Sequence, residues 1–372
     1  MLIMERLIKK GMNVYLYTYK RPEGLGDLDQ KIHLEELPII YPFMARRPDL
    51  LWRRTLLPAL ICWFKAFFVY KAKSNLVVDQ EGFLTFSKLF PWKRKNCHYI
   101  SFEIFIKNEI TDGRQKILKS QEKKLLKKGI SSLLIQGKYR YELFKEEHPG
   151  CNTERIYFLP VAPPKFQGEV KPDYIIPIPK GKKSIVYTGS LHHWAGILDL
   201  LDAFKNHWHP DFHLVIHYRF PEFQNPVIKV IQDLVANGYP VTLFIKKFVN
   251  EEYYPFLKQF NFALATYKSI SKSYHGIDGK NFEIIGLASG KFNTQMMLGI
   301  PTITTKSRSF LDFKKDYNFG YVMDNFADIG QALAYCMQHE EEMRKEAKRL
   351  YAEVINPELY IEQYINHLIE TK

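Results

Sequence analysis

The feature that most constrains the fold is an alternation of short apolar runs with amphipathic stretches, which occurs twice along the chain. In the second half, the β-branched runs Ile185–Thr188 and His213–Tyr218 flank a stretch with apolar residues three and four apart, from Ile197 to Phe204. Such a pattern is typical of parallel strands covered by helices. The second half is therefore predicted to be an open α/β domain.

The first half shows the same alternation, but it opens on a helical pattern from Leu2 that ends at Gly11. Most α/β domains open on a strand, so we expect either that this domain lacks its first strand or that the sequence begins after it. The expected strands are Asn13–Thr18, Asn75–Asp79, His98–Ser101, Ser131–Gln136, Arg155–Leu159, Val241–Ile245, Phe262–Thr266 and Pro301–Thr304. The expected helices are Leu50–Tyr70, Arg114–Lys128, Tyr139–Glu147, Pro226–Asn237, Glu251–Phe260, Lys291–Leu298 and Phe326–His339.

A proline-rich segment separates the two halves. Prolines stand at 160, 163, 164, 172, 177 and 179, a density that favours an extended linker. The predicted division is an N-terminal domain over 1–162, a linker over 163–183 and a C-terminal domain over 184–356, with a final helix over 357–372 packing back on the N-terminal domain. Two such domains enclose a cleft, and ligands of open α/β sheets bind beyond the carboxyl ends of the strands.

Charge and composition narrow the partners. The chain has 53 Lys and Arg against 40 Asp and Glu, a net charge of +13, which favours anionic ligands, nucleic acid or an acidic membrane surface. Nucleic acid ranks low because the aromatic residues fall mostly at apolar periodic positions. Four scattered cysteines without a CxxC pair argue against a disulfide scaffold or structural zinc. No run of 18 or more apolar residues is present, so we expect no membrane-spanning helix. The scattered cysteines favour a reducing compartment, and we expect a cytoplasmic protein, with a peripheral site on the inner membrane face as an alternative.

The strongest local motif is the segment 286–303, GLASGKFNTQMMLGIPTI. A turn of small residues opens a helix that ends at Gly299 before a β-branched strand. Backbone N–H groups at Ser289 and Gly290, together with the charge of Lys291, would form a cradle for a phosphate. The alternative is an ordinary helix cap followed by a solvated lysine.

A second motif, YTGSLHHW over 187–194, follows the first strand of the second half. Gly189 allows close backbone approach, and Ser190 can donate to an oxygen atom. The adjacent His192 and His193 suggest a metal, but sequence neighbours rarely bind one ion together and no carboxylate completes a ligand set. We therefore expect no metal, and loop packing is the alternative role for His192.

These motifs, in this order and followed by Phe-Gly-Tyr-Val at 319–322, resemble the C-terminal domain of GT-B glycosyltransferases, most closely the family 4 type. The resemblance covers about residues 183–372; the first half is similar in organisation only. It implies two Rossmann-like α/β/α domains facing a cleft. It also implies a nucleotide-sugar donor on the C-terminal domain, an acceptor on the N-terminal domain and no required metal or other cofactor.

The resemblance also implies roles for particular residues. Gly189 and Ser190 would lie at the donor phosphates, with the 289–291 cradle beside them. The departing diphosphate would be neutralised by Arg219, after the second strand, or by Lys246 or Lys247, after the third. For each of these cations a solvated surface position is the alternative.

One departure from the family concerns a pair of glutamates that many retaining members carry eight positions apart. Counted back from Gly299, those positions hold Thr294 and Gly286, so the pair is missing. Glu283 lies nearby and would contact sugar or ribose. The stereochemical outcome therefore stays open, and so does a non-catalytic member.

The first half offers carboxylates for a general base. Asp79 and Glu103 each follow a predicted strand, where an acceptor hydroxyl would face the anomeric carbon across the cleft. They are the leading catalytic candidates, and an exposed or capping carboxylate is the alternative for each.

A basic and aromatic stretch over 46–70, with further lysines over 116–128, would seat the protein on an anionic leaflet. The acceptor would then be lipid-linked; otherwise it is a saccharide, and the helix over 50–70 is a buried domain helix. The favoured function is thus a hexosyl transfer of polysaccharide biosynthesis. A sugar-nucleotide epimerase on the same fold and a nucleic-acid-binding protein are the competing classes. A dehydrogenase is weaker still because Gly24-Leu-Gly26 lacks a third glycine.

Overall fold

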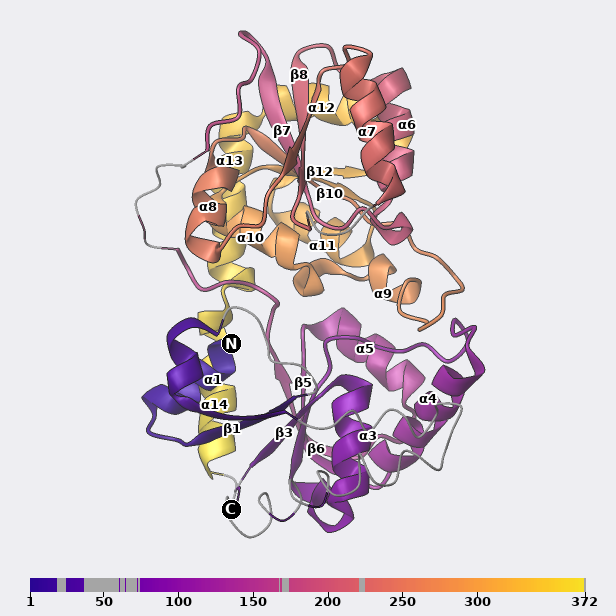
Figure 1. The fold of residues 1–372 in the computed structure, drawn as a ribbon, viewed down its shortest axis with the longest axis vertical. Coiled ribbons are helices and arrows are strands. Elements are labelled where there is room, and N and C mark those ends of the chain that lie inside the picture. Colours follow the sequence, from indigo (N-terminus) through magenta and orange to yellow (C-terminus); the bar gives the residue numbers. More distant parts are fainter. Residues whose placement is uncertain are drawn as a thin grey trace.

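The computed structural model describes residues 1–18, 25–36, 74–166, 174–220 and 225–370, with the isolated positions 60, 64, 72 and 168. Two α/β domains stand one above the other, with the N-terminal domain below (Figure 1). The chain passes between them near the proline-rich segment and again before the last helix. The predicted architecture of two Rossmann-like domains is confirmed.

The C-terminal domain is built on a sheet of six parallel strands. Their bounds are β7 Lys183–Thr188, β8 Phe212–Tyr218, β9 Val241–Ile245, β10 Phe262–Ala265, β11 Thr302–Thr305 and β12 Gly320–Met323. In space the order is β12-β11-β10-β7-β8-β9. This is the doubly wound order, in which the direction of winding reverses between β7 and β10.

Helices cover both faces of this sheet, because its strands are apolar on both sides. Leu214 and Ile216 of β8 share a core with one set of helices, whereas Val215 packs with α8 on the other face. The helices are α6 Ile197–His207, α7 Pro226–Ala236, α8 Asn250–Lys258, α9 Lys280–Glu283, α10 Gly290–Leu298, α11 Arg308–Asp316, α12 Ile329–Gln338 and α13 Glu340–Leu350.

The N-terminal domain has a parallel sheet in the order β3-β4-β5-β6. Its strands are β3 Asn75–Val78, β4 Cys97–Ile100, β5 Ile130–Ile135 and β6 Thr153–Phe158. The helices α3 Asp79–Leu89, α4 Gly113–Leu126 and α5 Lys138–Glu147 lie along the chain between these strands. A separate parallel pair is formed by β1 Val14–Thr18 and β2 Ile32–Glu36. Among the described residues the pair β1-β2 and the sheet β3-β4-β5-β6 are separate sheets.

The last helix, α14 Ile361–Glu370, lies beside α1 Leu2–Lys9 in the N-terminal domain (Figure 1). Ile365 and Leu368 of α14 share a core with Leu7 of α1 and with Leu134 of β5. The two helices therefore cover one face of the lower sheet, and the C-terminal end of the chain is part of the N-terminal domain's packing.

Several elements were not predicted from the sequence: β2, β12, α3 and α11. The segment of α13, Glu340–Leu350, lies in the tail that was expected to be helical up to Pro357. The helix expected at 50–70, the basic residues 46–54 and Gly24 lie outside the described residues. None of the described helices is both long and apolar enough to cross a membrane.

Candidate functional site

The reversal of strand order places two loops side by side at the carboxyl ends of β7 and β10. Gly189 and Ser190 follow β7, and Thr266 and Tyr267 follow β10. Because β7 and β10 are hydrogen-bonded neighbours, both loops open at the same crevice, the usual ligand site of doubly wound sheets.

Lys291, in the first turn of α10, reaches into this crevice. Its Nζ donates to the carbonyl oxygen of Thr266 at 3.0 Å and lies 4.3 Å from the centre of the Tyr267 ring. In the described part of the chain it forms no ion pair with a carboxylate. Burial lowers the pKa of Lys291 to about 7. An ammonium group held without a counter-charge is suited to bind an anion.

Gly189 lies next to the side chain of Lys291. Its φ is +142°, in the region that favours glycine, and a β-carbon added there would lie 3.7 Å from both Cδ and Nζ of Lys291. The next residue is held as well, because the Tyr187 hydroxyl donates to the Ser190 carbonyl at 2.6 Å. The structure therefore brings the two predicted phosphate-binding motifs together.

The start of α10 is less open than predicted. The amide of Ser289 donates to the carbonyl of Gly286 at 3.0 Å, so the expectation that this N–H is free is wrong. The Ser289 hydroxyl caps the helix by accepting from the amide of Phe292 at 3.1 Å, and it also bonds to the Tyr267 hydroxyl. The amides of Gly290 and Lys291 remain, at positions where a helix offers no internal acceptor.

An aromatic row closes one side of the crevice. The ring of His192 lies 6.2 Å from that of Trp194, which stacks on Phe282 at 5.1 Å; Phe282 in turn lies 5.5 Å from Tyr267. His192 is therefore an exposed member of a stack beside the crevice. Sequence analysis missed Tyr267 and Phe282, although the position of Tyr267 directly after a predicted strand was an available signal.

The other predicted cations follow the neighbouring strands β8 and β9. Arg219 is exposed after β8 and packs over the Phe220 ring at 4.7 Å. Lys246 lies 3.3 Å from the Tyr174 ring centre and is therefore turned toward the linker. Lys247 is exposed after β9, the edge strand two places from β7. Of the predicted cations, Lys291 is the one with a described contact at the crevice, its hydrogen bond to the Thr266 carbonyl.

The positions of the missing glutamate pair are filled by packing. Gly286 has φ +32°, and a β-carbon there would lie 2.3 Å from Cβ of Ser309. Thr294 is buried and its hydroxyl donates to the Gly290 carbonyl at 2.8 Å. Glu283 is exposed and accepts from the Ser269 hydroxyl at 3.0 Å. The pair therefore has no room at its usual place in this fold.

The two acidic candidates of the N-terminal domain lie next to each other. Oδ1 of Asp79 accepts from the amides of Phe102 and Glu103 at 2.6 and 3.0 Å. Asp79 has φ +51°, a strained value for a residue other than glycine, and burial raises its pKa to about 7. The Glu103 side chain is 49% exposed, and its carboxylate lies 3.9 Å from the guanidinium of Arg140.

The described residues contain no group of three or more His, Cys, Asp or Glu side chains that could hold a metal ion. His192 and His193 therefore have no described partner with which to complete a ligand set.

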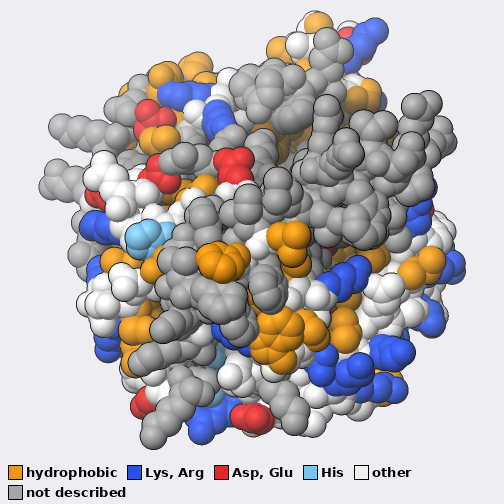
Figure 2. All heavy atoms as spheres, turned by 60° about the horizontal axis from the view of Figure 1, so that its bottom comes forward, with side chains coloured by type: hydrophobic (Ala, Val, Ile, Leu, Met, Phe, Trp, Pro, Cys, Tyr) orange, Lys and Arg blue, Asp and Glu red, His pale blue; other side chains and the backbone are white. Residues whose placement is uncertain are grey.

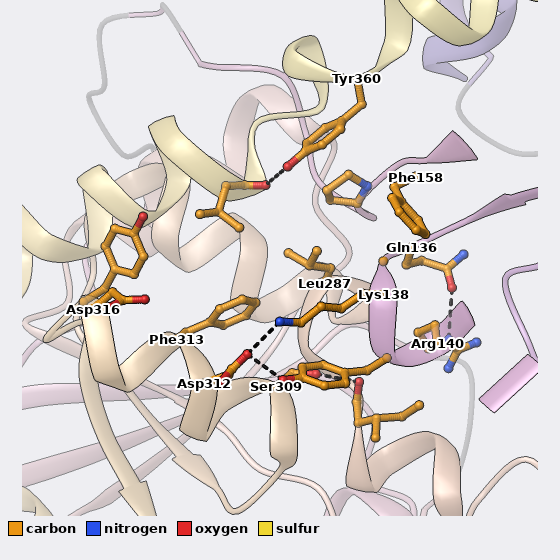
Figure 3. A pocket seen from close by; sticks show the side chains of 16 residues that line it. Gln136, Lys138, Arg140, Phe158, Leu287, Ser309, Asp312, Phe313, Asp316 and Tyr360 are labelled. Atoms are coloured by element: carbon orange, nitrogen blue, oxygen red, sulfur yellow. Dashed lines mark hydrogen bonds and ion pairs between the residues drawn. The ribbon is translucent and has the colours of Figure 1, made fainter. Parts of the chain in front are cut away.

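A cavity of about 430 Å³ lies between the domains on another side (Figure 3). Its walls come from the start of α5, from α11 and from the two chain crossings at Pro160 and Tyr360. Asp312 within it accepts from Lys138 at 3.0 Å and from Tyr139 at 2.5 Å (Figure 3). None of the residues predicted to bind the donor lines this cavity.

This arrangement defines the class of the fold: two Rossmann-like domains with a crevice at the C-terminal switch point, which is the GT-B fold of glycosyltransferases. Solved structures with this fold include HepE from Anabaena in complex with UDP-glucose, with 12% identity, 100% of this chain and 95% of that one covered, and a TM-score of 0.67. Sucrose-phosphate synthase from Thermosynechococcus elongatus has 14% identity, coverage of 99% and 91% and a TM-score of 0.67. A glycosyltransferase from Rickettsia africae has 12% identity, coverage of 100% and 94% and a TM-score of 0.67. No protein-family model matches the chain, and no curated protein matches its sequence.

Proposed function

We propose that the protein transfers a sugar, of the hexosyl type, from a nucleotide-sugar donor to a hydroxyl of an acceptor, without a metal. The observation that carries the proposal is Lys291, an ammonium group without an acidic partner among the described residues, which lies at the switch-point crevice beside Gly189 and two amides of a helix start. Together these groups fit the diphosphate of a nucleotide sugar.

The kind of donor is supported by the fold neighbours. HepE has been crystallised with UDP-glucose and with UDP, and the pneumococcal transferase GtfA with UDP and GlcNAc. A uridine nucleotide is therefore the first donor to test.

The proposed chemistry uses both domains. The acceptor oxygen attacks the anomeric carbon, its proton passes to the carboxylate of Asp79, and the bond from the anomeric carbon to the diphosphate oxygen breaks. The charge left on the diphosphate is stabilised by Lys291 and the adjacent amides. Asp79 suits the base role because a carboxyl with a pKa of about 7 is both available and basic near neutral pH. Glu103, its neighbour, is the rival base.

A lipid-linked acceptor is proposed from a basic face of the N-terminal domain. Lys116 and Lys124 on α4 flank the exposed Ile117, and Lys and Arg side chains lie beside exposed apolar ones on the face of this domain shown in Figure 2. Lys119 is buried and does not belong to this face, which corrects the lysine stretch read from the sequence. Each lysine near an anionic membrane surface contributes about 1 kcal/mol to the free energy of membrane binding.

The membrane proposal has a direct test. Flotation with vesicles containing phosphatidylserine should carry the protein upward, and Lys116→Glu with Lys124→Glu should leave it at the bottom. Equal flotation with neutral vesicles would remove the lipid-linked acceptor from the proposal, and with it the location on the inner membrane face. A cytoplasmic saccharide would then be the acceptor.

To test the transfer itself, the protein is incubated with UDP-sugars and candidate acceptors, and the release of UDP is followed. Thermal-shift screening against nucleoside diphosphates first selects the nucleotide. An epimerase would instead convert the nucleotide sugar without any acceptor, which proton NMR of the donor alone detects. Failure of every nucleotide to shift the melting temperature would contradict the proposal.

A further inference from the structure

The segment that carries Glu103 is held in place by three buried side chains from both domains. Gln136, at the end of β5, donates to the carbonyl at position 101 at 2.6 Å. Arg140 of α5 donates to the carbonyl at position 102. Asn281 of α9, in the other domain, donates to the carbonyl at position 104 at 2.7 Å. Three carbonyls of a four-residue segment are thus fixed by side chains far apart in the sequence.

The same segment fixes the second carboxylate. Its amides at positions 102 and 103 are the donors that hold Oδ1 of Asp79. Any change in the position of segment 101–104 therefore moves Glu103 and Asp79 together.

Arg140 is the centre of this arrangement. It is only 3% exposed, and its nitrogens are divided among partners: Nε donates to Oε1 of Gln136 at 3.0 Å, and Nη1 donates to Oδ1 of Asn281 at 2.8 Å. Figure 3 shows the contact with Gln136. The planar guanidinium can serve several acceptors at fixed angles, which a lysine cannot do.

Asn281 connects this arrangement to the C-terminal crevice. The next residue, Phe282, stacks between Trp194 and Tyr267, and the Tyr267 ring lies below the Nζ of Lys291. A continuous series of contacts therefore runs from Lys291 to segment 101–104.

The other contacts between α9 and the N-terminal domain are a hydrogen bond from the Lys280 amide to the buried Glu109 at 3.0 Å and an exposed ion pair. Lys280 forms an ion pair with Glu146 at 2.5 Å, and both side chains are largely in solvent. Exposed pairs of this kind contribute little because water screens them. The buried contact of Arg140 with Asn281 is better suited to transmit a displacement across the domain boundary.

We propose that Asn281, acting through Arg140, is a positioning residue that aligns the acidic pair with the donor crevice. Binding of the nucleotide at Lys291 fixes the aromatic row and α9, and Asn281 then fixes segment 101–104. The inference rests on the proposed function for the identity of the nucleotide; the contacts that hold the segment do not depend on it.

The test is hydrogen–deuterium exchange of segment 101–106, measured with and without UDP. UDP should slow exchange there in the unchanged protein, although the nucleotide binds to the other domain. Asn281→Ala should bind UDP within about twofold of normal affinity yet lose this protection. Lys280→Ala, the matched control on the same helix, should keep it. Protection that survives Asn281→Ala would overturn the inference.

A second measurement separates this inference from the proposed function. Without any nucleotide, Asn281→Ala and Asn281→Asp should both speed exchange at 104–106, since neither variant can donate to the carbonyl at position 104. Unchanged exchange refutes the positioning role even if UDP never binds. In the active enzyme the two Asn281 variants should lower kcat at least tenfold with little change in donor KM. Arg140→Lys should lower kcat as well, because a lysine cannot replace the guanidinium contacts.

Discussion

Replacing Lys291 with methionine is the sharpest test of the crevice. The change keeps most of the side-chain volume and removes the ammonium group that lies beside Gly189 and donates to the Thr266 carbonyl. Since no described carboxylate pairs with Lys291, its charge is available to the ligand. Loss of a hydrogen bond to a charged group costs about 1.5–3 kcal/mol, or roughly 10- to 150-fold in the dissociation constant.

The pH dependence of nucleotide-sugar binding gives a second estimate of the contribution of Lys291. With a pKa of about 7, Lys291 is about nine-tenths protonated at pH 6 and about one-tenth protonated at pH 8. Only the protonated form attracts the diphosphate. The affinity of the unchanged protein should therefore fall about tenfold between pH 6 and pH 8, with proton uptake on binding above pH 7.

The assay is calorimetric titration with UDP-glucose, whose phosphates are diesters and do not titrate in this range, unlike a terminal phosphate with a pKa near 6. Lys291→Met should bind weakly and without this pH dependence. Lys306→Met is the control, because Lys306 is exposed and paired with Asp324 at 2.7 Å yet carries the same charge. Equal affinities for Lys291→Met and the unchanged protein, or the same pH slope in both, would refute the assignment.

The remaining predictions concern the N-terminal domain. The raised pKa of Asp79 favours its protonated form in the fold, so stability falls as the pH rises from its ordinary value of 3.8 to about 7. Asp79→Asn should therefore abolish transfer yet raise the melting temperature at pH 8, whereas Glu81→Gln on the same helix should do neither. Lys119 and Glu122 form a buried ion pair at 2.8 Å, so Lys119→Met should cost about 3–5 kcal/mol in urea unfolding. The control Lys123→Met, whose lysine is 26% exposed in its ion pair with Glu147, should cost less. Lys119 and other donors lower the pKa of Glu122, so its stabilising contribution should be lost as the pH falls below 4.5 toward that lowered pKa; stability unchanged on acidification would contradict this reasoning.

The predictable part of the fold follows from local pattern. The strand at Val241–Ile245 has its predicted bounds, and those of β7 and β8 differ by one or two residues, because continuous apolar runs bounded by polar residues have few alternatives in a buried parallel sheet. The helical tail before Pro357 was also predictable, because the buried residues Met343, Ala347 and Leu350 of α13 stand at helical spacing. Strand Ile32–Glu36 was missed because its residues alternate with charges that a loop would also carry.

The site was predictable as motifs but not as an assembly. Gly189 and Lys291 were both identified from their positions after a strand and at a helix start, and the structure brings them into contact. The sequence placed Lys291 in the strongest motif but did not show that Lys291, rather than Arg219 or Lys247, reaches the crevice, because all three are lysine or arginine residues in loops or first turns. Their ranking depends on strand order, which puts β7 beside β10 and β9 at an edge.

The sequence by itself determined where strands end, where helices begin and which short segments can bind an anion, because these depend on residues a few positions apart. Tertiary structure alone decided that Asn281 reaches segment 101–104 of the other domain and that Asp79 lies under the amides of that segment. Such contacts join residues brought together by the packing of two sheets across a linker. Local propensity carries no information about the distance between the two domains, which is set by the burial of their interface as a whole.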